Sequence, residues 1–283
     1  MNKYLIITVL ILISQVANGQ FVPEFSGQIN TPEFINPGFN ASKQKPTGIF
    51  LFSNNFNNKE GYNGTSAINL NLPVNNWHTG FGTTLIHEFI GDVGKTNGTF
   101  NTCVNVTILK STYLAFGLGL GFERIDSSDI KNRNQFNSSS AISNFIYSSS
   151  GLNLFSENLH LGLGVHCTQL GKKLEFNYEY FTYFLNGSYN FVMEESPSIK
   201  PVLMYCYYLG VSHYEAGVFM NFNKVFETGV TYRSNQSIIC FAEINFFKLA
   251  LLGYCFQYKF EESSHLSDGL HEFSLKFILP NKF

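Results

Sequence analysis

The residues of this chain that could do chemistry are few, and their spacings fit reaction centres poorly. His160 and His166 stand six residues apart, too far to hold one metal ion without further ligands. Glu175 and Glu179 stand four apart and could pair on a helical turn as an acid and a base. The competing interpretations are a polar lining for the histidines and a solvated loop for the glutamates, and we favour these.

Short catalytic motifs are also missing. No nucleophile elbow, P-loop, H-E-x-x-H motif or dinucleotide fingerprint occurs. The five cysteines are widely spaced, whereas a disulfide framework or a zinc site needs tighter clusters such as C-x-x-C. We expect them to be small apolar strand residues: Cys103, Cys167, Cys206, Cys240 and Cys255. The sequence therefore predicts a protein that is not an enzyme and that uses no metal and no cofactor.

The elements that must position these residues follow a period of two. Between residues 157 and 168, apolar and polar side chains alternate one by one, which is the pattern of a β-strand. The apolar face of this stretch comprises Leu159, Leu161, Leu163, Val165 and Cys167. His160 and His166 fall on the opposite, polar face.

Composition decides what kind of β-protein this is. Charged residues make up 13% of the chain and aromatic residues 16%. A soluble β-sandwich would carry more charge on its polar face. Alternating stretches of about ten residues with few charges predict an all-β fold, a transmembrane antiparallel β-barrel of the bacterial outer membrane. The net charge of −2 argues against a nucleic-acid partner.

Three regions follow from this pattern. Residues 1–19 are typical of a signal peptide, with Lys3, an apolar run over 4–13 and Ala-Asn-Gly before the expected cut. Residues 20–46 lack alternation and carry four prolines, which suits an extended segment outside the ladder. This segment could fill the lumen as a plug or lie against the periplasmic rim. Residues 47–283 are predicted to form the barrel.

Fourteen strands are expected in that region, an even number as bacterial barrels require. Their predicted ranges are 47–56, 63–73, 78–90, 98–109, 112–125, 143–155, 157–168, 184–193, 197–207, 211–222, 224–233, 236–245, 248–259 and 269–280. The three longest connections, 126–142, 169–183 and 260–268, all fall at the same end of such a barrel. We expect that end to lie outside the cell and the short turns to lie in the periplasm.

The strand pattern also predicts which side chains meet lipid. In 112–125, we expect the outward row Leu114, Phe116, Leu118, Leu120 and Phe122. The inward row is then Ala115, Gly117, Gly119, Gly121 and Glu123. A porin lumen usually carries opposed charged rows, so this small, nearly uncharged row favours a closed or occupied interior.

Two short stretches after the leader, residues 21–28 and 34–38, contain Pro23, Phe25, Gln28, Asn36 and Pro37. These stretches resemble the opening motif of the PorP/SprF family of Bacteroidetes outer-membrane proteins. Further similar stretches follow in the same order at 89–94, 97–99, 118–122, 252–258 and 269–275. Three positions depart from the pattern: Gly27, Gly38 and Gln257.

The resemblance implies a part in type IX secretion and gliding. Such a protein would receive secreted adhesin-like cargo through the cargo's C-terminal sorting domain and hold or deliver it at the cell surface. Other translocon components and outer-membrane lipid are the remaining expected partners. Candidate cargo-binding residues stand in the two longest loops: Asp126, Asp129, Arg133, Phe136, Glu175, Tyr178 and Tyr180. The alternatives are an outer-membrane channel for small or apolar solutes and, third, a soluble secreted β-protein.

Overall fold

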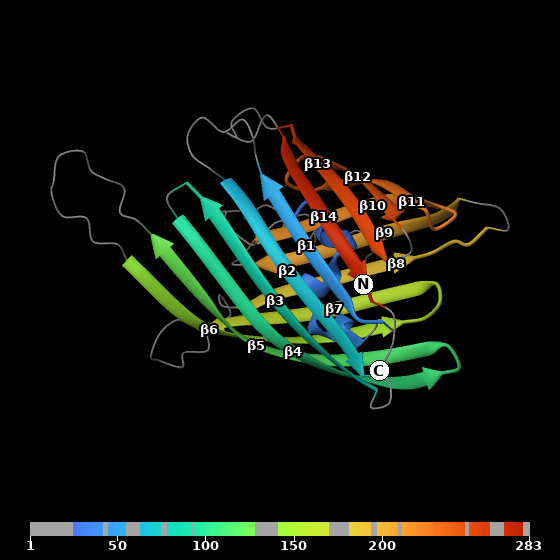
Figure 1. The fold of residues 1–283 in the computed structure, drawn as a ribbon, viewed down its shortest axis with the longest axis horizontal. Coiled ribbons are helices and arrows are strands. Elements are labelled where there is room, and N and C mark those ends of the chain that lie inside the picture. The colour runs from blue at the N-terminus through green and yellow to red at the C-terminus, as the bar shows by residue number, and fades with distance from the viewer. Residues whose placement is uncertain are drawn as a thin grey trace, which may run out of the picture.

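The computed structural model shows a single closed barrel with a short N-terminal segment inside it (Figure 1). The residues that it describes are 25–41, 45–54, 63–74, 78–91, 93–127, 141–169, 181–193, 197–208, 211–246, 249–260 and 269–279. The predicted signal peptide lies outside these ranges. No helix in the described ranges is long and apolar enough to cross a membrane.

Fourteen antiparallel strands form the barrel wall, as the sequence predicts. They are β1 (Thr47–Asn54), β2 (Asn63–Val74), β3 (Thr79–Ile90), β4 (Val93–Leu109), β5 (Thr112–Ser127), β6 (Ala141–Phe155), β7 (Leu159–Gln169), β8 (Phe181–Tyr189), β9 (Ser198–Tyr208), β10 (Val211–Phe222), β11 (Phe226–Arg233), β12 (Ser237–Phe246), β13 (Ala250–Lys259) and β14 (Leu270–Ile278). Each strand pairs with its neighbours in the chain, and β1 pairs with β14 from Thr47↔Ile278 to Asn54↔His271. Closure leaves no edge strand exposed to lipid.

Two predicted strands are placed wrongly. β4 begins at Val93 rather than at 98, because a two-residue hairpin pairs Ile90 directly with Val93. Gly91 supplies the positive φ of 58° that this turn requires. β8 covers Phe181–Tyr189 rather than 184–193, and an isolated bridge, Phe191↔Ile199, is all that continues it. The other boundaries agree with the prediction to within two residues.

The predicted inward and outward faces are confirmed. On β5, Leu120 is 69% exposed and Ala115 is fully buried. The same alternation holds on β14, where Phe273 and Phe277 are exposed outside and Glu272 is buried inside. Leu, Phe, Val and Tyr thus form the outer surface, which suits contact with lipid acyl chains.

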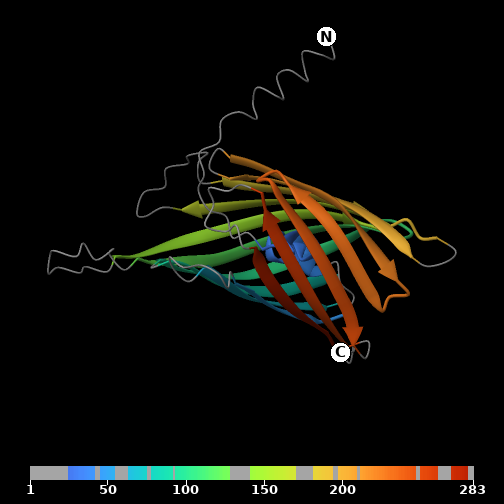
Figure 2. The same cartoon turned by 90° about the horizontal axis from the view of Figure 1, so that it is seen from above.

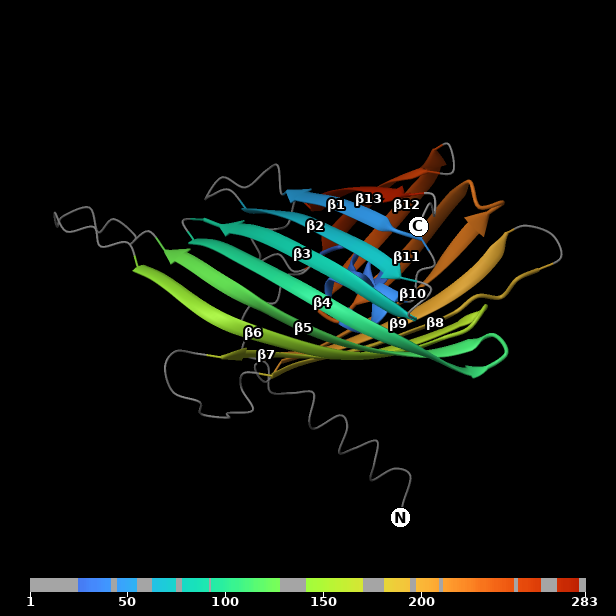
Figure 3. The ribbon, with the colours of Figure 1, turned by 60° about the horizontal axis from the view of Figure 1, so that its bottom comes forward.

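The two ends of the barrel differ in their connections. At one end lie the three longest connections in the chain, 128–140, 170–180 and 260–269, and we call this the long-loop end. The other end carries the turns after β2, β4, β6, β8, β10 and β12, and we call it the short-turn end. Figure 3 shows β5 and β6 projecting furthest at the long-loop end. β5 and β6 are long because their pairing continues as far as Ser127↔Ala141.

Candidate functional site in the barrel lumen

Residues 25–41 lie inside the barrel, and we call them the plug segment. They form three short 3-10 helices, η1 (Gln28–Asn30), η2 (Pro32–Phe34) and η3 (Pro37–Ala41). Pro32 and Pro37 begin the second and third, where a missing backbone N–H costs nothing. Figure 2 shows these helices between the orange and red strands and the teal and green strands. The plug therefore occupies part of the lumen.

Apolar side chains of the plug make a small core with the wall. Phe25 and Phe39 are 1% and 2% exposed, and Phe34 packs on Phe25 with ring centroids 5.2 Å apart. Ile49 and Leu51 of β1 belong to the same buried cluster as Phe25 and Phe34. Burial of one such side chain is worth about 1.5–3 kcal/mol. The plug and the wall of this barrel thus share a small apolar core.

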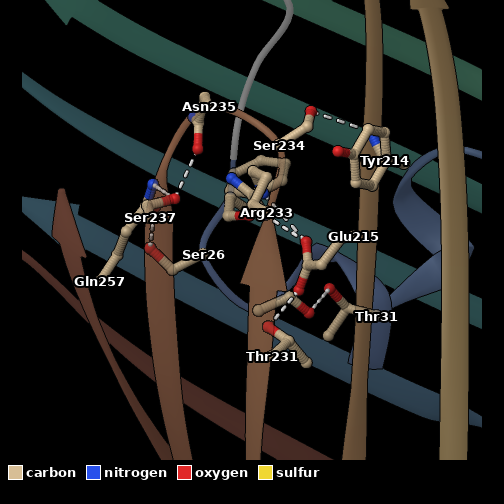
Figure 4. Close-up of polar contacts among 12 residues, drawn as sticks. Ser26, Thr31, Tyr214, Glu215, Thr231, Arg233, Ser234, Asn235, Ser237 and Gln257 are labelled. Carbon is tan, nitrogen blue, oxygen red and sulfur yellow. Dashed lines mark hydrogen bonds and ion pairs between the residues drawn. The ribbon is translucent and has the colours of Figure 1, made fainter. Parts of the chain in front are cut away.

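One side of the wall holds the plug with charged and polar side chains, which we call the clamp. The clamp comprises Glu215, Thr231, Arg233, Gln257 and Glu272, and Figure 4 shows the first four of them. Arg233 donates to Glu215 Oε2 from Nε and Nη2, at 2.9 and 2.8 Å, and its Nη2 also donates to the Phe25 carbonyl at 3.0 Å. Glu215 Oε1 accepts from the Thr231 hydroxyl at 2.6 Å. The ion pair is almost fully buried, so each charge depends on the other.

The rest of the clamp binds the two residues that follow Phe25. The carboxylate of Glu272 accepts from the Ser26 amide at 2.7 Å and from the Gly27 amide at 2.9 Å. Gln257 accepts from the Ser26 hydroxyl at 3.1 Å and donates to Ser237 at 3.0 Å. A Cβ on Gly27 would lie 2.8 Å from Glu272 Oε1, so glycine permits the close approach.

The opposite side of the wall carries a row without side chains. Gly117, Gly151 and Gly164 are register partners across β5, β6 and β7, and we call them the glycine row. A Cβ on Gly117 would fall on the backbone of Pro37, and one on Gly151 would fall on the Asn36 side chain. The row therefore makes room for plug residues 35–38.

Asn36 and His166 connect the plug to that side of the wall. Asn36 Nδ2 donates to the Leu152 carbonyl at 3.1 Å, and its Oδ1 accepts from the Gly38 amide at 2.8 Å. His166 Nε2 bonds to the Ile35 carbonyl, and its Nδ1 bonds to the Tyr147 hydroxyl at 2.7 Å. These contacts pair backbone carbonyl groups and an amide group of the plug and the wall, which buried polar groups require.

The structure places the predicted site residues in two groups. Phe25, Gln28, Asn36 and Pro37 lie in the plug segment, whereas Pro23 lies outside the described residues. Of the candidate loop residues, Asp126 is the one described, and it forms an exposed ion pair with Arg124 at 3.0 Å. The other six lie outside the described residues: Asp129, Arg133, Phe136, Glu175, Tyr178 and Tyr180.

Sequence reasoning missed the clamp. Glu215, Arg233 and Glu272 stand singly on the inward face of three strands, and no short motif joins them. The available signal was the alternation itself, which marks a lone charge on a polar face as pointing into the lumen. Within the described ranges, no three metal-binding side chains come together. What this arrangement can do is hold a peptide segment by its backbone.

The family assignment agrees with this architecture. Residues 17–277 match the family "Type IX secretion system membrane protein PorP/SprF". The chain belongs to the PorP/SprF family. Of the three positions that we expect to depart from the family's motif, Gly27 donates its amide to Glu272, and Gln257 accepts from the Ser26 hydroxyl. The third, Gly38, donates its amide to Asn36.

Several solved structures resemble the chain at low sequence identity. Omp33 of Acinetobacter baumannii has a TM-score of 0.49 and 7% identity over 83% of this chain and 97% of its own. A Pseudomonas aeruginosa FadL homologue has a TM-score of 0.49 and 10% identity over 92% and 96%. A variant of the Rh. blastica porin has a TM-score of 0.38 and 9% identity over 83% and 99%. No curated protein matches the chain in sequence.

Family, closed barrel and apolar outer surface together make this an outer-membrane β-barrel of the type IX secretion system.

Proposed function

We propose that the protein receives secreted adhesin-like cargo through the cargo's C-terminal domain and holds or delivers it at the cell surface. The observation that carries this proposal is that the plug segment occupies the lumen. A barrel whose interior is occupied by its own plug, pinned on two sides, offers little passage for solutes. The surfaces left for a partner are the rims, and the long-loop end carries the three longest connections.

The same observation argues for binding rather than catalysis. The charged groups of the clamp are committed to the plug backbone and to one another. A cargo domain would then be held at the long-loop end by loop side chains, with the candidate residues of 126–142 and 169–183 among them. Other components of the translocon are the expected partners elsewhere on the surface.

The test compares surface proteins and culture supernatant in wild type, a gene deletion and strains with loop 126–142 or 169–183 shortened. We expect the deletion to remove one or a few specific proteins from the surface while general type IX export continues. The shortened loops should release the same proteins into the medium, since loops tolerate length changes that strands do not. An unchanged surface proteome, with altered uptake of a small solute, would instead support the channel.

A further inference from the structure

A groove lies on the outer wall of the barrel, over the neighbouring strands β13, β14, β1, β2 and β3 (Figure 1). Its volume is about 380 Å³, within the range of roughly 300–1,000 Å³ that small-molecule sites occupy. Large apolar side chains line it: Phe50, Phe52, Ile68, Leu85, Leu252 and Phe273. All six are between 38% and 48% exposed, so they face away from the lumen. The groove therefore belongs to the lipid-facing surface.

One small side chain explains why the wall is hollowed there. An outward-facing row of register partners crosses four of these strands: Phe273, Phe52, Ser66 and His87. Ser66 is the smallest of the four and stands between two rings, so the surface is lowest over Ser66. A chain of methylene groups laid there would touch side chains beneath it and on both sides, which multiplies its dispersion contacts.

His87 gives the groove a polar end. Its Nδ1 bonds to the Thr96 hydroxyl of β4 at 2.7 Å, and its Nε2 bonds to none of the described residues. Phe89, two residues nearer the hairpin between β3 and β4, is 41% exposed, so the apolar surface continues past His87. An imidazole nitrogen that faces hydrocarbon without a partner is costly. A polar group that arrives with a lipid would remove this cost.

We propose that this groove binds one phospholipid molecule. One acyl chain lies over Ser66 between the apolar side chains, and a phosphate oxygen accepts a hydrogen bond from His87 Nε2. In this arrangement Nδ1 accepts from the Thr96 hydroxyl, which leaves the ring proton on Nε2. The occupant follows from position, because the groove is continuous with the surface that contacts lipid. The site lies outside the lumen and does not depend on cargo.

The experiment is native mass spectrometry of the full-length protein released from detergent micelles. The probes are dioleoyl-phosphatidylglycerol and dioleoylglycerol, which has the same acyl chains and no phosphate. We expect the wild-type protein to retain one phosphatidylglycerol molecule, at least fivefold more than dioleoylglycerol at the same concentration. A series of equally weak adducts, without a preferred first molecule, would overturn the site.

Variants then locate the site. Ser66→Leu fills the groove and should reduce the retention of both lipids at least fivefold. Thr102→Leu is the matched control, because Thr102 is also exposed on the outer wall, as a register partner of Leu118, and lies outside the groove. It should change nothing. Heat-modifiable gel mobility checks that each variant is a folded barrel.

A third variant separates the polar end of the groove from its apolar part. His87→Phe keeps a ring at the wall and removes both ring nitrogens. We expect the retention of phosphatidylglycerol to fall to the level of dioleoylglycerol, whose own retention should stay the same. An undiminished preference for phosphatidylglycerol would show that His87 does not bind the phosphate.

Unchanged retention of both lipids in Ser66→Leu would contradict the proposal. The same spectra also report oligomers. A wild-type dimer that Ser66→Leu abolishes would assign the groove to a second copy of this chain and would overturn the lipid site.

Discussion

The clamp and the glycine row hold the same plug by opposite means. On the clamp side, long charged side chains from β11 and β14 reach the plug backbone. On the glycine side, the wall residues have no side chains, so the plug backbone lies directly against the strands. The first contact depends on the pairing of buried charges, and the second depends on the absence of wall side chains. The two sides of the wall therefore hold one plug with different kinds of contact, and they have no sequence motif in common.

The largest effect should come from breaking the clamp. Arg233→Met leaves Glu215 buried without its cation and removes the bond to the Phe25 carbonyl. We expect a loss of about 3–5 kcal/mol in the free energy of unfolding. Urea titration of the protein refolded into lipid vesicles measures it.

The control for that variant is another arginine in an ion pair. Arg124→Met breaks the exposed pair with Asp126 and should change stability by no more than about 0.5 kcal/mol. Equal losses for the two variants would mean that the clamp is not a buried electrostatic contact.

The glycine row should respond to added volume. Gly117→Ala puts a methyl group on the backbone of Pro37, which cannot turn away as a side chain would. We expect a loss of about 1–3 kcal/mol from overpacking, and faster proteolysis of the plug segment. Gly94→Ala is the matched control, because a Cβ there meets nothing within 4 Å. A stable, protease-resistant Gly117→Ala protein would show that the plug does not rest on this row.

The smallest of the three effects should come from Asn36→Ala. It removes the bonds to the Leu152 carbonyl and the Gly38 amide, and we expect a loss of about 1–2 kcal/mol. Asn30→Ala, in the same plug segment, gives up a single long contact to Lys200 at 3.5 Å and should be nearly neutral. An equal loss of unfolding free energy in Asn30→Ala and Asn36→Ala would show that the Asn36 contacts do not hold the plug in place.

The barrel itself was predictable from the sequence, because a period of two assigns each side chain to lipid or lumen. Strand number and both faces of β5 followed from that rule. The start of β4 did not, because residues 93–97 carry too few apolar side chains to alternate, and register with β3 extends the strand instead.

The site was less predictable. Phe25 and Asn36 were marked by the family resemblance, but nothing in the sequence chose between the lumen and the periplasmic rim. Arg233, which bonds to Phe25, and Glu272, which bonds to Ser26, stand more than 200 residues further along the chain than these partners. These residues come together only when the barrel closes, and no short stretch of sequence predicts which strands then lie beside the plug.

The central claim is that the plug occupies the lumen, and single-channel recording in planar lipid bilayers tests it most directly. The wild-type protein should insert without stable conductance, and the protein lacking residues 25–41 should give discrete open steps. Stable, open conductance from the wild-type protein would contradict the account and favour a solute channel.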